Sequence, residues 1–231
     1  MASIDGRNHR RVGAAVLATL GALVLTVACG KPEFTFVANK DENTYFKVPY
    51  EWTEIDPRSI DSFVGNTAPG SYNDLLHKER LWSVAYDAAE DPTSLHMTSA
   101  MVTQEPVFYF AIQKLQTAER DTMSLDVMRN FFLPVTDERR KLATDAEVGL
   151  PGFELIIDEE VQPAPGLHGV RVVYNYQLPS GIPHTFDQSV YVNNDASTLY
   201  FLLFRCSFDC YVGRKAEIDE VVTSFTVRSQ Q

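Results

Sequence analysis

The sequence predicts an α+β fold in which an antiparallel β-sheet carries helices packed on its faces. Two observations lead to this prediction. Short segments that alternate apolar and polar residues recur along the chain, and turn signals separate them, as in a meander of antiparallel strands. Segments with helical periodicity follow these runs of strands, which indicates α+β architecture.

The expected strands are short and rich in β-branched and aromatic residues. In the clearest one, Val170, Val172, Tyr174 and Tyr176 share one face, while polar residues dominate the other. Turn residues at 163–166, 178–181 and 193–195 separate the expected strands. The pattern predicts strands at residues 33–38, 44–49, 81–87, 97–104, 107–116, 153–161, 169–178, 185–193 and 198–206.

Helical spacing of apolar residues predicts three main helices. The first covers residues 71–79, and the second begins at Ser124 as N-cap and ends before Pro134. The third runs from Asp209 or Cys210 to Ser224 and presents an apolar face that includes Ile218. The highly charged residues 136–147 are expected to add a solvated helical turn.

Aromatic side chains are abundant at 11% of the chain, and many lie in its first half. Phe108, Tyr109 and Phe110 are consecutive, so a strand that contains them must point rings to both of its faces. A core covered by helices on both faces explains this arrangement. An aromatic-lined cavity for a ligand, or a face covered by a partner, is the alternative.

The N-terminus has the features of an export signal. Residues 1–11 are polar and net basic, and residues 12–28 form an unbroken run of apolar and small residues without charge. The run ends in Leu25-Thr-Val-Ala-Cys29-Gly30, which resembles a bacterial lipobox, the sequence in which the Cys becomes lipid-modified. We therefore expect a signal peptide at 1–28, a lipidated Cys29 with a short tether at 29–32, and one globular domain at 33–231. An uncleaved anchor helix is the alternative interpretation.

The predicted location is the extracytoplasmic face of the cell membrane, to which the lipid on Cys29 would anchor the protein. The formal net charge of -11 should repel phosphate backbones and anionic head groups, so we expect no nucleic-acid partner. Cationic partners remain compatible with this charge.

The chain contains three cysteines. If Cys29 carries lipid, Cys206 and Cys210 remain as a pair in an oxidising compartment, which favours a disulfide between them. The alternative is a redox or metal pair, but the spacing is not the C-x-x-C of thioredoxin-like sites and no His stands close in sequence.

Both ends of the expected domain resemble a known family. Residues 46–52 read Phe-Lys-Val-Pro-Tyr-Glu-Trp, and residues 218–227 read Ile-Asp-Glu-Val-Val-Thr-Ser-Phe-Thr-Val. This opening and closing resemble the PsbP-type α/β/α sandwich. Together with the lipobox and with residues 91–96, 105–107, 120–124 and 128–130, they resemble the actinobacterial LpqN-type lipoproteins, to which the same fold is assigned.

The resemblance implies binding or assembly work at the cell envelope and supplies no catalytic residues. It implies that no cofactor is needed. The domain is therefore expected to be a non-enzymatic factor that binds an envelope protein. A carrier or sensor of an apolar ligand such as an envelope lipid is the second hypothesis, and an enzyme is the third.

Few residues indicate chemistry directly. No catalytic serine motif, phosphate-binding loop or zinc-hydrolase motif occurs, so no catalytic and no metal site is predicted. His184 with Asp187, near His168 across a hairpin, is a weak alternative metal pair, and a surface histidine is the preferred interpretation of His184. Residues 158–160, Asp-Glu-Glu, are either paired carboxylates or a solvated strand end.

Overall fold

The structure is a computed structural model that describes residues 31–228. Its main element is a seven-stranded sheet in which every neighbouring pair of strands is antiparallel. In spatial order the strands are β3 (Thr53–Ile55), β4 (Leu81–Asp87), β5 (Val107–Lys114), β9 (Thr198–Ser207), β8 (Pro183–Asn193), β7 (Leu167–Gln177) and β6 (Glu154–Val161). The predicted α+β class is confirmed.

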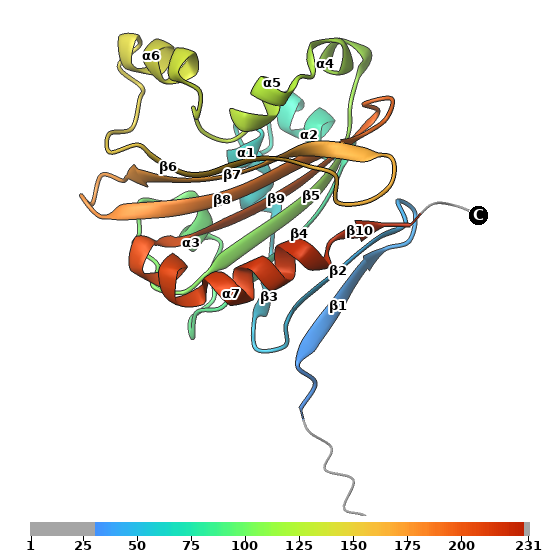
Figure 1. The fold of residues 1–231 in the computed structure, drawn as a ribbon, viewed down its shortest axis with the longest axis horizontal. Coiled ribbons are helices and arrows are strands. Elements are labelled where there is room, and N and C mark those ends of the chain that lie inside the picture. The colour runs from blue at the N-terminus through green and yellow to red at the C-terminus, as the bar shows by residue number, and fades with distance from the viewer. Residues whose placement is uncertain (1–30, 229–231) are drawn as a thin grey trace, which may run out of the picture. The chain divides into compact units, whose positions relative to one another are not determined.

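One long helix and a small second sheet cover one face. Helix α7 (Phe208–Ser224) lies against this face, beside a sheet made of β1 (Phe34–Asn39), β2 (Thr44–Pro49) and β10 (Thr226–Val227) (Figure 1). Phe108 and Phe204 stack with ring centroids 4.4 Å apart, and Trp52 packs edge-on against Phe204. We call this side the α7 face.

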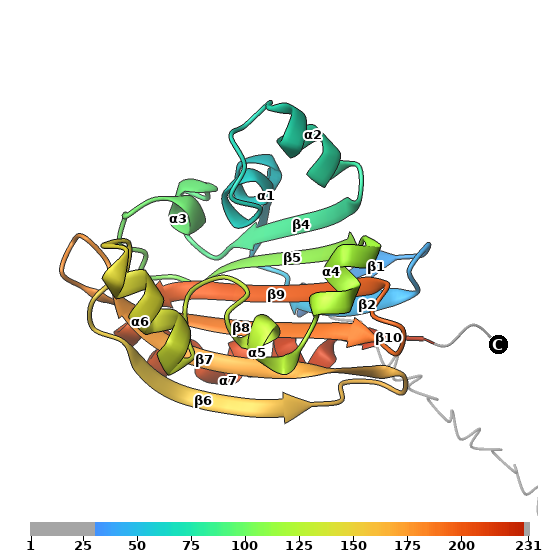
Figure 2. The same ribbon diagram turned by 90° about the horizontal axis from the view of Figure 1, so that it is seen from above.

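Short helices and loops cover the opposite face, which we call the loop face (Figure 2). The helices α1 (Arg58–Val64), α3 (Leu95–Thr98) and α5 (Leu125–Arg129) contribute Ile60, Met97 and Met128 to its core. The remaining helices are α2 (Tyr72–Lys78), α4 (Thr117–Thr122) and α6 (Asp137–Asp145).

The alternation of residues along β5 and β7 is as expected. Phe108 and Phe110 belong to the core of the α7 face, whereas Tyr109 is buried in the core of the loop face. All three rings are buried, so the ordinary sandwich core explains the aromatic run and no partner is required to cover it.

Ser124 is an N-cap, as expected, and Ser71 is a second serine N-cap that was not predicted as one. The hydroxyl of Ser71 accepts from the backbone N–H of Asp74, and that of Ser124 accepts from Val127. The helix after Ser124 ends at Arg129, however, so Phe132 lies beyond it. Ser207, two or three residues before the expected start, caps α7.

The strand predicted at residues 97–104 is wrong. Residues 95–98 form α3, and 99–106 form a loop. Alternating residues suggested a strand, but β9 is already paired with β5 and β8 on its two sides, so no edge of it is free there. The segment is instead fixed by Arg205, whose guanidinium donates to the carbonyls of Met97 and Met101.

Besides α3, four short elements were not predicted, namely β3, β10, α1 and α4. Each has seven residues or fewer and lacks a periodic pattern of its own. The predicted signal peptide and the predicted lipid-modified Cys29 lie outside the described residues. Within the described part of the chain, no helix is long and apolar enough to cross a membrane.

Candidate functional site

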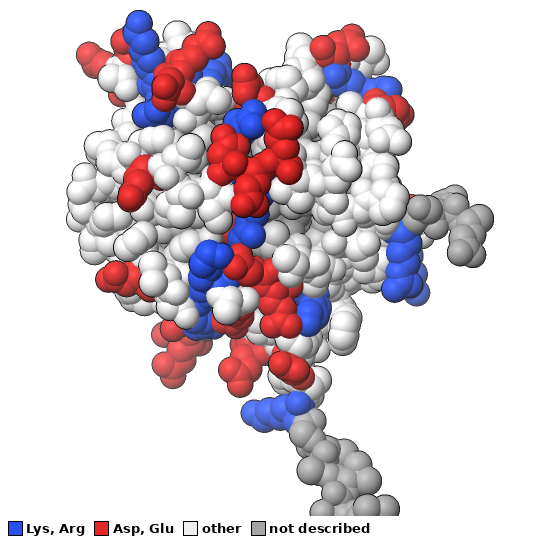
Figure 3. All heavy atoms as spheres, viewed as in Figure 1, with Lys and Arg blue, Asp and Glu red and all other residues white. Residues whose placement is uncertain are grey.

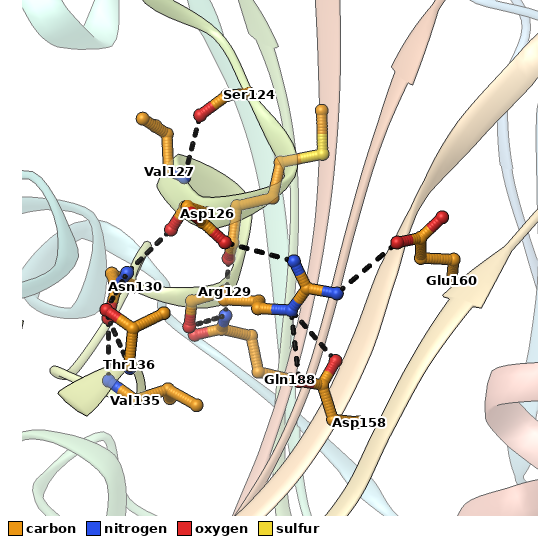
Figure 4. A network of polar contacts seen from close by, with 11 residues as sticks. Ser124, Asp126, Val127, Arg129, Asn130, Val135, Thr136, Asp158, Glu160 and Gln188 are labelled. Atoms are coloured by element: carbon orange, nitrogen blue, oxygen red, sulfur yellow. Dashed lines mark hydrogen bonds and ion pairs between the residues drawn. The ribbon is translucent and has the colours of Figure 1, made fainter. Parts of the chain in front are cut away.

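An acidic surface forms where α5 meets the edge strand β6. Arg129 of α5 lies between three carboxylates (Figure 4). Its Nε donates to both oxygens of Asp158 at 2.9 and 3.0 Å, while Asp126 and Glu160 lie 3.1 and 3.5 Å from its Nη atoms. The hydrogen bond to Asp158 raises the pKa of Arg129. One cation facing three anions leaves this surface negative.

Buried amides hold this surface in place. Gln188 of β8 is fully buried, and its Nε2 donates to the carbonyls of Met128 and Arg129, the end of α5. Its Oε1 accepts from the backbone N–H of Phe132. Asn130 accepts from two further backbone N–H groups, those of Val135 and Thr136 (Figure 4). These hydrogen bonds therefore fix the position of the backbone that carries Asp126 and Arg129.

Strand β6 is the last strand of the sheet, and no described strand pairs with its outer edge. Leu155 and Ile156 are 45% and 39% exposed, and the pairing with β7 shifts register between Leu155 and Ile157. Acidic side chains gather in a band on this face of the molecule, from the region of α5 down to α7 (Figure 3). We call Glu154–Val161 together with Asp126 and Arg129 the β6 edge.

The carboxylates at 158–160 can now be assigned. Asp158 and Glu160 share Arg129, while Glu159, between them in the strand, must point to the opposite face. A neighbouring arginine favours the ionised form of a carboxyl group, whereas a general acid must hold its proton. The pairing with Arg129 therefore indicates a structural or binding role for Asp158 and Glu160.

The α7 face contains a largely buried arginine, 11% exposed, with two anionic partners. Arg171 Nε and Nη2 donate to the two oxygens of Asp187 at 3.0 and 2.6 Å, and Nη2 also reaches Asp219 at 2.6 Å. Tyr211 of α7 donates to Asp187 as well. Burial opposes the charge on Arg171, but these hydrogen bonds outweigh it and raise its pKa. The cluster ties α7 to β7 and β8.

The loop face contains a buried arginine with no such partner. Arg205 is 3% exposed, and it donates to the carbonyls of Met97 (2.7 Å) and Met101 (2.9 Å) and to His184 Nδ1 (3.3 Å). No carboxylate of the described chain forms an ion pair with Arg205, and burial lowers its pKa to about 10. A charged residue between the apolar run 200–204 and Cys206 was the sequence signal for this site, and the sequence analysis did not use it.

His184 is not a surface histidine, as was expected, but is fully buried. Burial, and then the charge of Arg205, lower its pKa to about 4. Because Nδ1 accepts from Arg205, the proton is on Nε2, and that buried atom has no hydrogen-bond partner.

The alternative metal pair is not assembled either. His184 pairs with Tyr176 and His168 with Val192, at opposite ends of the β7–β8 ladder. Asp187 contacts Tyr211 and Arg171 on the α7 face, away from His184. Among the described residues no group of three or more His, Cys, Asp and Glu could hold a metal ion.

Three hollows of about 320 to 400 Å³ lie around α6, and two smaller hollows lie elsewhere on the loop face, beside Tyr109 and beside Arg205. One of the two smaller hollows has a volume of about 240 Å³ and is lined in part by His77, Tyr109 and Glu119. The other, of about 190 Å³, is lined mainly by apolar side chains and by Arg205. Small-molecule sites are typically ~300–1,000 Å³, so neither of these two hollows would enclose a whole lipid.

One buried histidine–carboxylate pair was missed by the sequence analysis. His96 Nδ1 donates to Asp87 Oδ2 at 2.7 Å, and Asp87 also accepts from the backbone N–H groups of Ala89 and Thr93. Two of these donors come from the loop that follows β4, and His96 comes from α3, which ends this loop. The pair therefore fastens this loop, and a nearby nucleophile that would make it catalytic is not found among its contacts.

Cys206 and Cys210 are joined by a disulfide at the junction of β9 and α7, with Cα atoms 5.9 Å apart. Both cysteines are buried. The bond closes the turn between the central strand pair and the helix that covers it.

The fold has counterparts among solved structures. No family model and no curated protein matches the sequence. The PsbP-like protein CyanoP of Synechocystis sp. PCC 6803 is similar over 90% of this chain and 100% of its own, at 18% identity and a TM-score of 0.52. At this identity the likeness shows the fold alone: a PsbP-like arrangement of antiparallel sheets with helices on them.

Two further structures are similar at lower scores. LpqN of Mycobacterium tuberculosis, described as involved in cell envelope biogenesis, matches 85% of this chain and 91% of its own at 13% identity and a TM-score of 0.46. The Ran-binding protein Mog1p of Saccharomyces cerevisiae matches 84% and 95% at 10% identity and 0.41.

Proposed function

We propose that this protein is a non-enzymatic accessory protein of the cell envelope, held at the extracytoplasmic face of the membrane by lipid on Cys29. It binds an envelope protein through the β6 edge, and the segment it takes is extended and basic. The observation that carries this proposal is the free edge of an eight-residue strand set among fixed carboxylates.

The free edge supplies the affinity. A strand at the end of a sheet presents unpaired N–H and C=O groups, and a second chain that adds as a strand satisfies them. Leu155 and Ile156 offer apolar contact beside this backbone. Strand addition by a partner therefore needs no rearrangement of the sheet.

The carboxylates supply the selectivity. Two copies of β6 placed side by side would bring acidic side chains together, and like charges in facing positions are destabilising. A partner strand with Lys or Arg meets the opposite sign and is favoured. The same charges thus disfavour self-association and favour a basic partner.

The anchor restricts where such a partner can be. Five peptide units separate Cys29 from Phe34, the first residue of β1, so the lipid and the domain are at most ~18 Å apart. The partner segment would therefore lie close to the bilayer surface, as part of a membrane protein or of another anchored protein.

In-cell crosslinking tests the docking surface. A photoreactive residue at Ile156 should give one discrete adduct in the producing bacterium, and the same residue at Val212, an exposed position of α7, should not. Glu159→Lys should abolish the Ile156 adduct. Glu138→Lys, an equal charge change on exposed α6, should leave it. Equal adducts at both positions, or an adduct insensitive to Glu159→Lys, would contradict the docking surface.

Mass measurement tests the anchor separately. The mature chain should begin at Cys29 and carry diacylglycerol, whereas Cys29→Ser should lack this mass and leave the membrane fraction on washing. An unmodified Cys29 in a membrane-bound chain would favour the uncleaved helix. That result would leave the β6 edge untouched, so the two parts of the proposal can fail independently.

A further inference from the structure

The buried guanidinium of Arg205 lacks a counter-ion, and this is unusual. Transferring an ion from water into a protein interior costs several kcal/mol unless an opposite charge or good hydrogen bonds compensate. On the α7 face, the comparably placed Arg171 has Asp187 and Asp219. Arg205 has only two carbonyls and a neutral imidazole.

Arg205 also keeps unused hydrogen-bonding capacity. A guanidinium has five N–H donors, and three of them have partners here, so one N–H on each Nη atom remains. Two N–H groups side by side match the two oxygens of a carboxylate. Neighbouring His184 adds a second buried group with an unpartnered N–H.

The hollow beside Arg205 supplies the rest of a small site. Its wall is made by Phe63 of α1, Met97 of α3, Leu133, Leu178 and Phe186, and its volume is about 190 Å³. One water occupies ~30 Å³, so the hollow has room for roughly six non-hydrogen atoms. The lining contains no acidic side chain that would repel an anion.

We propose that this hollow binds the carboxylate end of a short aliphatic acid, with the carboxylate on Arg205 and the hydrocarbon against the apolar wall. The inference is independent of the β6 edge. A ligand longer than the hollow would extend out of it into solvent.

The charge argument decides between ligand classes. An alcohol or ester of the same length would bury equal apolar area but would leave Arg205 without its counter-ion. An amine would add a second buried cation. The site should therefore distinguish three ligands that share one hydrocarbon body.

Methyl-detected NMR of the exported Cys29→Ser chain tests this directly, with hexanoate, hexanol and hexylamine as probes. Hexanoate should shift the methyl signals of Met97, Ala100, Leu133 and Leu178 in a saturable way, hexanol should bind at least tenfold more weakly, and hexylamine should not bind. Equal binding of hexanoate and hexanol would overturn the role of Arg205. Absence of binding, or shifts confined to the hollow at Tyr109, would overturn the site.

Two variants complete the test. Arg205→Gln should lose the preference for hexanoate over hexanol, but its loss of three hydrogen bonds can also impair folding. Ala100→Phe fills the hollow from an exposed loop position without touching Arg205, and it should abolish binding while the melting temperature stays unchanged. Unchanged binding in a folded Ala100→Phe variant would contradict the proposal.

Discussion

Each face of the sheet contains an arginine that is largely or fully buried, but the two arginines differ in the charge of their partners. On the α7 face, Arg171 is held by two carboxylates, one of them from the 17-residue helix α7. On the loop face, Arg205 has only neutral partners, beside a hollow, under short helices and loops. The long helix α7 covers its sheet face with a continuous row of apolar side chains and adds one compensated polar cluster, whereas the short segments of the loop face depend on buried polar groups to fix their backbone.

This difference suggests a division of roles. The α7 face contributes stability, because two carboxylates compensate the charge of Arg171 and the aromatic rings of this face are packed together. The loop face retains spare donors, and the β6 edge beside it retains free backbone groups and surplus carboxylates. Unmet hydrogen bonds and charges of this kind are what a binding partner can satisfy.

Breaking the compensated pair should have the largest effect. Asp187→Asn leaves Arg171 buried with one carboxylate and removes the acceptor of Tyr211. We expect a loss of ~3–5 kcal/mol in the free energy of unfolding, measured by urea denaturation, because the buried charge loses its partner. A loss below ~1 kcal/mol would show that Arg171 does not depend on the carboxylate of Asp187, and it would contradict the difference drawn here between Arg171 and Arg205.

The buried His184 should make the loop face sensitive to acid. Its folded pKa is about 4, below the ordinary 6.5, so the unfolded chain takes up a proton first as the pH falls. Its contribution to stability is complete above pH 6.5 and is lost as the pH falls through 4. The shift corresponds to on the order of 3 kcal/mol.

His184→Gln keeps an acceptor for Arg205 and does not titrate, so its unfolding free energy should fall less between pH 7 and 4 than that of the unaltered chain. The exposed His168→Gln serves as the matched control and should not change the pH dependence. Identical pH profiles for His184→Gln and the unaltered chain would contradict the assigned protonation.

Removing the disulfide should have an intermediate effect. Cys206→Ser with Cys210→Ser opens a short loop at the start of α7. Loop-closure entropy predicts a loss of ~2 kcal/mol. Thermal denaturation of the double variant and of the reduced chain should give the same result, and a stable reduced chain would show that packing alone fixes this junction.

The smallest effect on stability is expected at the β6 edge. Asp158→Asn weakens a partly exposed pair with Arg129 and should change the unfolding free energy by less than ~1 kcal/mol. The same change should weaken the crosslink from Ile156, since it lowers the negative charge offered to a basic partner. A large loss of stability would identify Asp158 as a structural residue instead.

Much of the scaffold could be predicted. Eight of the nine predicted strands lie on strands of the structure, since the alternation along β7 and the continuous apolar run of β9 both mark buried strands. The failure at 97–104 has a tertiary cause: the neighbouring strand had both edges occupied, and Arg205 took the carbonyls. Local pattern carries no information on either point.

The candidate sites were less predictable. Residues 158–160 were noticed, but Arg129, 29 residues from Asp158, was not connected with them. Arg205 and Met97 are 108 residues apart, and His184 was taken for a surface residue. Contacts across such separations depend on strand order, which periodicity does not encode.

The sequence by itself determined the α+β class, the buried alternation, the N-cap at Ser124 and the expectation of a lipid anchor on Cys29, because each depends on neighbouring residues. Only the tertiary structure decided which charges are compensated. Burial and ion pairing depend on which residues the fold brings together. The carboxylates beside Arg171, and the neutral partners of Arg205, are therefore known only from the tertiary structure.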